Sequence, residues 1–227
     1  MKAAATRRAA TRRAPEWPRR RASEIIEAAA KVFAERGYHG ASTQDIADVL
    51  GIRQASLYYY FRSKEEALEQ VCLRGVEGYV ERAEAIVAGT GSATEKLRRL
   101  IHRHLSPLLD RAVFVRVFQR ERRYLPDASR RRVGRLARKY ERIVQGVLQA
   151  GVASGEFGRD TDCRLTALAI LGMCNAATAW YGIEPDAGVD RIAETFTSLV
   201  TSGVLARNRP RTRVDIHANE RIRSDPR

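Results

Sequence analysis

The sequence predicts an all-α protein of about nine helices, and three features of its 227 residues carry that prediction. Apolar residues recur at intervals of three and four positions, the spacing of a helix with one buried face. No segment sustains the alternation of polar and apolar residues that marks a half-buried strand. The few prolines stand at the edges of the expected helices. Hydrophobic residues make up 44% of the chain, enough for a substantial core.

The N-terminal part is expected to begin with a helix over residues 21–36, which Gly37 ends as a left-handed stop. The buried face of this helix comprises Ile25, Ile26, Ala29, Val32 and Phe33. A second helix, 42–51, starts with a capping box formed by Ser42 and Asp45. Its inner face is Ile46, Ala47 and Leu50, and Gly51 ends it. After a short turn the sequence predicts a third helix, 54–60.

The remaining helices follow in close succession. Ser63 with Glu66 predicts a second capping box, which opens a long helix through about Val87. The glycine-containing segment 89–92 breaks that helix. Further helices are expected at about 93–110, 112–123, 127–152, 161–182 and 188–206. Within 127–152 one apolar stripe comprises Val133, Leu136, Tyr140, Ile143, Val144, Val147 and Leu148.

The charge of the chain favours an anionic partner. The formal net charge is +14 and the isoelectric point is about 10.4. An excess of this size must be solvated or matched by anions, and nucleic acid is the commonest large polyanion. From composition alone, a basic soluble protein without such a partner is the alternative.

Cysteine use and hydropathy favour a cytoplasmic protein with no membrane partner. Cys72, Cys163 and Cys174 are odd in number and far apart, so no disulfide framework, metal site or cofactor is predicted. Each is expected to serve as a small buried hydrophobe. The apolar segment 165–183 is just long enough to span a membrane. The polar and glycine positions within it favour a buried helix at a subunit interface instead.

Two short helices joined by a tight glycine-containing turn form a helix-turn-helix, whose second member enters the major groove of DNA. Here the second member carries QASLYYYF, residues 54–61. We expect Leu57 to point inward and Phe61 to fill the seam with the following helix. Tyr58 and Tyr60 are then directed toward DNA, where a ring can contact a thymine methyl and a hydroxyl can reach a phosphate. Tyr59 is expected to be partly structural.

These residues also carry a family resemblance. The segment IIEAAAKVFAERGYHGASTQDIADVLGIRQASLYYYFRSKEEAL, residues 25–68, resembles the DNA-binding domain of the tetracycline-repressor (TetR) family of bacterial regulators. The likeness rests on the strings A-x-x-x-F-x-x-x-G-Y/F, T-x-x-x-I-A-x-x-x-G and S-L-Y-x-Y/H-F-x-S-K-E-x-L. It implies an all-α homodimer that binds double-stranded DNA at a palindromic operator, represses transcription, and is released by a small-molecule effector.

Carried over by position, the resemblance implies DNA contacts by Ser42, Thr43, Gln44, Arg53, Gln54, Ala55, Ser56, Tyr58, Tyr60 and Lys64. Thr43 begins its helix, where a hydroxyl and a backbone N–H can hold a phosphate. Gln44 and Gln54 can bond base edges, and Lys64 is expected to meet a phosphate. For each polar residue the alternative is an exposed surface side chain.

The expected domains are a disordered basic arm at 1–20, the helix-turn-helix domain at 21–66, a ligand-binding and dimerisation domain at 67–206, and a charged flexible tail at 207–227. We expect the arm to add affinity for the DNA backbone with little sequence choice.

The resemblance implies that the helices at about 161–182 and 188–206 form a four-helix bundle with a second copy. The first offers a small-residue face comprising Ala167, Leu168, Leu171, Cys174, Asn175 and Thr178. The second supplies Ile192, Phe196, Leu199, Val200 and Val204. Burial of these faces within one subunit is the alternative. A two-fold protein matches two groove-facing helices placed one DNA turn apart.

Most members of the family hold their effector among the middle helices. The segments 117–157 and 179–182 resemble members that sense acyl-coenzyme A (acyl-CoA) thioesters. The implied effector-binding residues are Phe114, Phe118, Arg120, Arg123, Tyr140, Asn175 and Trp180. The arginines would meet phosphates and the aromatic side chains would line an acyl tunnel. A solvated basic face and ordinary core packing are the alternatives, so the effector class stays open.

An enzyme is not expected, because no nucleophile–base pair or phosphate loop stands in a recognisable setting. His102 and His104 lie two positions apart, on opposing sides of a helix, and cannot share a metal ion. The competing function is a sequence-tolerant architectural DNA-binding protein, suggested by the two basic termini. A family member that activates transcription is a further alternative, which transcription assays separate from a repressor.

Overall fold

The computed structural model describes residues 16–183 and 188–205, and these residues form ten α-helices with short 3-10 segments. The helices are α1 (Glu16–Gly40), α2 (Thr43–Leu50), α3 (Gln54–Leu57), α4 (Lys64–Val76), α5 (Tyr79–Ala88), α6 (Ala93–Leu105), α7 (Ala112–Glu121), α8 (Asp127–Ser154), α9 (Cys163–Ala176) and α10 (Val189–Val204). The all-α prediction is confirmed for the described part of the chain, whose only extended pairing is an isolated bridge between Phe157 and Leu205.

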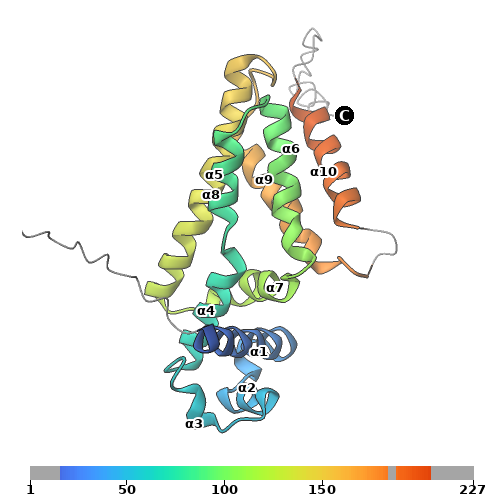
Figure 1. The fold of residues 1–227 in the computed structure, drawn as a ribbon. Coiled ribbons are helices and arrows are strands. Elements are labelled where there is room, and N and C mark those ends of the chain that lie inside the picture. The colour runs from blue at the N-terminus through green and yellow to red at the C-terminus, as the bar shows by residue number, and fades with distance from the viewer. Residues whose placement is uncertain (1–15, 184–187, 206–227) are drawn as a thin grey trace, which may run out of the picture.

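The helices form a small N-terminal group below a taller bundle (Figure 1). α1, α2 and α3 lie at one end of the molecule. α5, α6 and the long α8 rise away from them, with α9 and α10 along one side. α7 lies crosswise between α1 and the bundle.

The apolar interior consists of two clusters that meet near α7. The first joins α1–α4 with the inner face of α7 and the start of α8, and includes Phe33, Leu57, Leu68, Val117 and Phe118. The second fills the taller bundle and includes Leu97, Ile101, Tyr140, Leu148 and Ile170. α1–α4 therefore share one apolar core with α7.

The predicted long helix at 64–87 is wrong, because the chain breaks between α4 and α5. Glu77 is extended, and Gly78 has φ 75, a left-handed conformation that favours glycine. Periodicity alone missed this break, since apolar spacing continues on both sides of it. The break explains why ten α-helices form where about nine were expected.

The N-terminal boundaries also differ from expectation. α1 begins at Glu16, so residues 16–20, assigned to the basic arm, are helical. Gly37 has φ 66 and interrupts the helix as predicted, although helical geometry resumes through Gly40. The rest of the predicted arm, residues 1–15, and the predicted tail at 207–227 lie outside the described residues.

Helix capping follows the sequence closely at one predicted site and partly at the other. At Ser42 the capping box is complete, because Ser42 accepts from the Asp45 N–H and Asp45 accepts from the Ser42 N–H. At Ser63 only half of the box forms. The Ser63 hydroxyl accepts from the Glu66 N–H at 3.2 Å, but Glu66 accepts from the Arg62 N–H instead.

The small-residue face of α9 lies largely inside the subunit, which corrects part of the predicted dimer face. Ala167 and Cys174 are buried, and Leu171 and Asn175 line an internal cavity. Leu168 from that set remains exposed, together with Leu165 one turn earlier. No helix in the described ranges is long and apolar enough to cross a membrane.

The packing of α4 against α7 requires a glycine at position 75. A Cβ there would lie 2.8 Å from the Phe114 carbonyl oxygen and 3.1 Å from the Phe118 Cβ. We predict that Gly75→Ala lowers the free energy of unfolding by about 1–3 kcal/mol, because the two backbones must separate. Gly146→Ala is the matched control, since nothing lies within 4 Å of a Cβ there. The control should raise stability by about 0.5–1 kcal/mol. Urea denaturation measures both changes, and equal effects would contradict the close-packing argument.

Candidate nucleic-acid interface and ligand cavity

The aromatic run divides between core and surface as the chain turns out of α3. Leu57 and Phe61 are buried, as predicted. Tyr58 is 50% exposed, while Tyr60 is partly buried against the first core cluster. The expectation that Tyr59 is partly structural is wrong, because its side chain is 85% exposed. Three consecutive positions on one helical turn point in different directions, so one tyrosine anchors the turn and two are presented outward.

The other predicted DNA-contacting residues lie on or directly before α2 and α3, except Lys64, which begins α4. Ser42, Gln44, Arg53, Ala55 and Ser56 are exposed, whereas Thr43, Gln54 and Lys64 are partly buried. The two glutamines of this set bond to neighbours within the domain. Gln54 Nε2 donates to Thr43 Oγ1 at 2.6 Å, and Gln44 Nε2 donates to Asp48 Oδ1 at 2.6 Å. The first bond ties α3 to the start of α2 and fixes their relative orientation.

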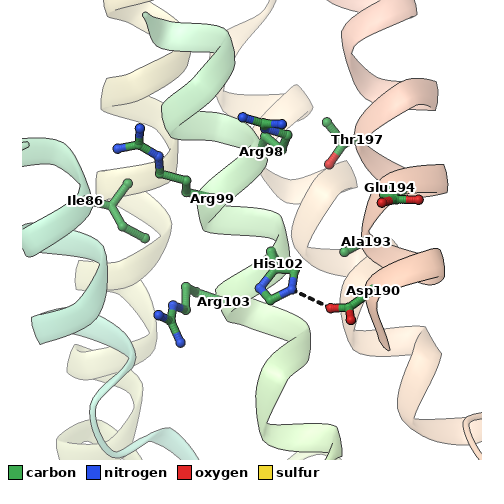
Figure 2. Close-up of a pocket in the computed structure, with 9 residues that line it drawn as sticks. All are labelled: Ile86, Arg98, Arg99, His102, Arg103, Asp190, Ala193, Glu194 and Thr197. Carbon is green, nitrogen blue, oxygen red and sulfur yellow. Dashed lines mark hydrogen bonds and ion pairs between the residues drawn. The ribbon is translucent and has the colours of Figure 1, made fainter. Parts of the chain in front are cut away.

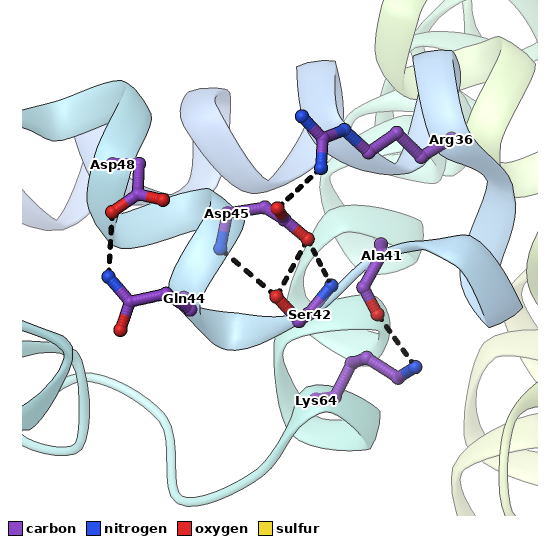
Figure 3. A network of polar contacts seen from close by, with 7 residues as sticks. All are labelled: Arg36, Ala41, Ser42, Gln44, Asp45, Asp48 and Lys64. Atoms are coloured by element: carbon purple, nitrogen blue, oxygen red, sulfur yellow. Dashed lines mark hydrogen bonds and ion pairs between the residues drawn. The ribbon is translucent and has the colours of Figure 1, made fainter.

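Figure 3 shows the polar network at the start of α2. The Asp45 carboxylate accepts from the Ser42 side chain and backbone and pairs with Arg36 on α1. These hydrogen bonds from Ser42, and then the charge of Arg36, hold the pKa of Asp45 below its ordinary value. The carboxylate therefore stays ionised and pins the N-terminus of α2 against the end of α1.

Lys64, predicted to meet a phosphate, is used within the protein. Its ammonium donates to the Tyr38 carbonyl and to the Ala41 carbonyl, each at 2.9 Å (Figure 3 draws the second). The same ammonium lies 4.4 Å from the centroid of the Tyr38 ring, a cation–π contact. Lys64 thus clamps the segment between α1 and α2 onto the start of α4.

Tyr38 is the residue at which several elements meet. Its backbone N–H donates to Glu121 Oε2 of α7 at 3.0 Å, and its hydroxyl donates to Glu65 of α4. Its ring stacks on Tyr124, with centroids 5.5 Å apart. Burial, followed by the bond to Glu65, raises the pKa of Tyr38 to about 12, so the phenol keeps its proton. The end of α1 is in this way bonded directly to α7.

A cavity of about 90 Å³ lies between α4, α5, α6, α7, α8 and α9. Its lining comprises Gly75, Val76, Tyr79, Val80, His104, Val115, Phe118, Arg122, Leu136, Ala137, Tyr140, Leu171 and Asn175. Of the predicted effector contacts, Phe118, Tyr140 and Asn175 belong to this lining. The others lie elsewhere: Phe114 packs in the first core cluster, Arg120 and Arg123 are exposed, and Trp180 packs against Phe196.

A chain of hydrogen bonds crosses the wall of this cavity. His104 Nε2 lies 3.1 Å from Asn175 Oδ1, and its Nδ1 lies 3.3 Å from the Tyr140 hydroxyl. Asn175 Oδ1 also accepts from Gln119 Nε2 at 3.0 Å. Burial lowers the pKa of His104 to about 4, so the imidazole is neutral at physiological pH. Because Asn175 Oδ1 can only accept, Nε2 carries the proton and Nδ1 accepts from Tyr140.

The sequence-based interpretation missed Tyr79, His104 and Arg122 as lining residues. A signal for His104 was present, because it follows Leu100 by four positions and Ile101 by three and therefore falls on the buried face of α6. Arg122 gave no such signal. Its guanidinium lies 4.7 Å from the centroid of the Phe118 ring, at an exposed position just after α7.

A second groove, of about 520 Å³, lies between α6 and α10 (Figure 2). Arg98, Arg99, His102 and Arg103 supply a basic side, and Asp190 and Glu194 an acidic one. His102 Nε2 and Asp190 Oδ1, 2.8 Å apart, join the two helices. The Asp190 side chain is 85% exposed and that of His102 45%, so solvent screens this pair and it adds little to stability.

The exposed second helix of a packed helix-turn-helix, joined to a bundle with an internal cavity, defines a ligand-responsive DNA-binding protein. Residues 25–71 match the model for bacterial regulatory proteins of the tetR family. Residues 90–204 match the model for the tetracyclin repressor-like C-terminal domain. The chain belongs to the TetR family, which confirms the resemblance carried by residues 25–68.

Similar proteins of known role are transcriptional regulators. The chain is 29% identical over 182 residues to the fatty acid metabolism regulator protein of Bacillus subtilis, covering 80% of this chain and 94% of that one. It is 29% identical over 191 residues to the transcriptional repressor KstR2 of Mycolicibacterium smegmatis, covering 84% and 93%. The structure of FadR from Bacillus subtilis in complex with stearoyl-CoA matches with a TM-score of 0.67 and 29% identity, over 80% of this chain and 98% of that one.

The position of Lys64 predicts a structural role that can be separated from phosphate binding. We expect Lys64→Met to lower the free energy of unfolding by about 1–2 kcal/mol, because it removes two charge-assisted hydrogen bonds. Lys31→Met, at an exposed lysine of α1, should leave stability unchanged. Thermal unfolding measures both. Unchanged stability of Lys64→Met, together with a salt dependence of DNA binding reduced by about one phosphate contact, would assign Lys64 to DNA instead.

Proposed function

We propose that this chain is a transcriptional repressor that binds a palindromic operator as a homodimer and is released by a small-molecule effector. The observation that carries the proposal is the outward face of α2 and α3, on which Arg53, Ser56 and Tyr58 are exposed while Leu57 anchors the helix. Such a face fits the major groove, with polar side chains toward base edges and phosphates. The net charge of +14 favours association with DNA over long range.

The proposed DNA contacts are those implied by position, with two changes drawn from the geometry. Ser42, Thr43, Gln44, Arg53, Gln54, Ala55, Ser56 and Tyr58 are retained. Tyr59 joins them because its ring is the more exposed of the two outward tyrosines. Tyr60 and Lys64 support the surface from behind, although an unused N–H of Lys64 remains free to reach a phosphate.

The proposed dimer interface is formed by α9 and α10. Leu165 and Leu168 on α9, Leu199 on α10 and Leu205 directly after it are exposed. Exposed apolar side chains grouped on neighbouring helices are typical of a surface that another subunit covers. α10 stands at the outer edge of the bundle in Figure 1, away from α2 and α3, so the two DNA-binding surfaces stay uncovered.

The proposed signal passes from the cavity to DNA through α7. Phe118 lines the cavity and also belongs to the core of the DNA-binding helices. Three residues later, Glu121 bonds the backbone of Tyr38. A ligand that displaces α7 would shift the end of α1, and with it the spacing of the two recognition helices in the dimer. It needs only to bind the displaced state more tightly than the resting one.

The effector we propose is an acyl-CoA thioester. The Bacillus subtilis FadR structure holds stearoyl-CoA, and the cavity described above occupies the middle helices of the same fold. Arg122 at the cavity lining is the cation best placed for an anionic group, in place of the predicted Arg120 and Arg123.

The protein would act in the cytoplasm as a regulator and not as an enzyme. The arm at 1–15 would add backbone contacts.

DNase footprinting on the upstream region of the protein's own gene tests the proposal. We expect protection of one palindrome, and Arg53→Ala or Tyr58→Ala should weaken binding to it by about tenfold or more, since good base contacts contribute about 1–3 kcal/mol. Arg138→Ala, at an exposed arginine of α8 and therefore outside α2 and α3, is the matched control. Uniform coverage of unrelated DNA, insensitive to Arg53 and Tyr58, would favour the architectural alternative.

The dimer interface has its own test. We predict that Leu199→Arg converts the dimer to a monomer, because an unpaired charge would be buried at a cost of about 3 kcal/mol or more. Leu109→Arg is the control, at an equally exposed leucine outside α9 and α10. Sedimentation velocity distinguishes the two states. A dimer that persists in Leu199→Arg but not in Leu109→Arg would move the interface away from α10.

A further inference from the structure

We infer that the cavity selects a short, uncharged acyl group of about three to five carbons, whose carbonyl is bound by Asn175 while its anionic remainder stays outside near Arg122. This inference rests on the proposed function, because it names the kind of thioester that the effector site accepts. The inferred acyl group is shorter than the stearoyl group in the Bacillus subtilis FadR structure.

The volume of the cavity sets the size of the group. Ligand pockets for drug-sized molecules typically measure about 300–1,000 Å³, and an apolar cavity of roughly 150 Å³ admits benzene, with its six carbons. At about 90 Å³, this cavity offers space for roughly three or four carbon-sized groups. One further atom can lie in its mouth. A long acyl chain or a fused ring system would require the surrounding helices to separate.

The wall of the cavity is packed against both core clusters, so a ligand that needs more space than a displacement of α7 provides would break further contacts. Phe118 packs into the core that holds the DNA-binding helices, and Tyr140 is buried in the second core cluster. The Tyr79 hydroxyl donates to the His104 backbone carbonyl at 3.1 Å, and the rings of Tyr79 and Tyr140 meet edge to face 5.4 Å apart. Expansion for a larger ligand would break these contacts, and the interior of a packed protein resists such changes.

The polar groups of the cavity wall are neutral, which excludes a buried charge. His104 is uncharged, and its two nitrogens are already satisfied by Asn175 and Tyr140. Burial raises the pKa of both Tyr79 and Tyr140 above the ordinary phenol value, so neither supplies a negative charge. A carboxylate placed among these groups would lose its hydration without gaining a cation. The buried part of the ligand is therefore uncharged.

Asn175 is the residue that can recognise a carbonyl within this neutral setting. Its Oδ1 is held by His104 Nε2 and Gln119 Nε2, and Gln119 is in turn held by the Thr178 hydroxyl at 2.7 Å. These bonds fix the plane of the amide. The two Nδ2 protons remain as hydrogen-bond donors of Asn175, and Asn175 lines the cavity. A thioester carbonyl oxygen accepts such a bond.

The mouth of the cavity supplies the positive charge that its wall lacks. Arg122 is exposed, lines the cavity, and stacks over the Phe118 ring. Stacking restrains the guanidinium without consuming its N–H donors, which remain free for a phosphate or a carboxylate. The anionic contact would come from the phosphates of coenzyme A, and the experiment below compares the thioester with a free acid of the same chain length.

Isothermal titration calorimetry of the full-length protein with acetyl-, butyryl-, isobutyryl-, octanoyl- and palmitoyl-CoA, with coenzyme A, and with butyrate tests the inference. We expect butyryl- or isobutyryl-CoA to bind most tightly and palmitoyl-CoA at least about tenfold more weakly, because overfilling a packed cavity is costly. The order should be the same for release from the operator. Butyrate binding as tightly as butyryl-CoA would overturn the inference, because the only carbonyl of butyrate belongs to its charged group and cannot lie at Asn175 while the charge stays at Arg122.

Substitutions in the wall provide a matched control within one helix. Val115 lines the cavity, while Val113, two residues earlier on α7, does not. Val115→Ala should shift the preferred acyl length upward by about one or two carbons, since it removes two methyl groups from the wall. Val113→Ala should leave the preference unchanged. Asn175→Ala should weaken thioester binding about tenfold or more while leaving the order of chain lengths unaltered.

The possible results separate a failure of the size inference from a failure of the proposed function. Palmitoyl-CoA binding as tightly as butyryl-CoA, or better, overturns the size inference and leaves the proposed regulator intact. If no thioester of any length binds while the operator is still protected, the thioester assignment fails and the inference with it. The size inference is also overturned if Val115→Ala keeps the original length preference while its thermal unfolding matches that of Val113→Ala.

Discussion

The close approach of α4 and α7 at Gly75 is the constraint on which the rest of the structure depends. It seats α7 in the core of the DNA-binding helices, so that Phe118 serves both that core and the cavity wall. A side chain at position 75 would separate the two helices. The wall would then lose its contact with the helices that carry the recognition surface, and a ligand in the bundle would have no rigid element through which to act on them.

The polar contacts around Tyr38 complete this connection. Apolar packing holds α7 near α1 without direction, whereas the bond from the Tyr38 N–H to Glu121 fixes where the end of α1 lies. Lys64 and Glu65 then tie the same residue to α4. Lys64 shows that a basic residue beside a DNA-binding surface can have a structural role. Its charge is stabilised by two carbonyl groups, and these bonds hold the segment between α1 and α2 against α4.

Local chemistry was predictable where neighbours in sequence are also neighbours in space. The capping box at Ser42 and the inward positions of Leu57 and Phe61 follow from helical spacing alone. The break at Gly78 was missed because a helix with apolar residues on both sides of a glycine has the same pattern as an unbroken one. The small residues of α9 were ambiguous in the same way, because their spacing fits a dimer face as well as the interior of one subunit. Only the position of α6, α7 and α8 against α9 decides that Ala167 and Cys174 are buried.

The sequence by itself determined the helical class, the recognition helix and the family, because each depends on short strings whose geometry is local. The tertiary structure alone decided which residues face the cavity. Asn175, His104 and Arg122 come from three separate elements, and their meeting depends on how those elements cross. Arginines close together in the chain, Arg120, Arg122 and Arg123, differ in role for that reason. The sequence specifies charge and residue type, but the packing of elements distant along the chain sets the direction in which a side chain points.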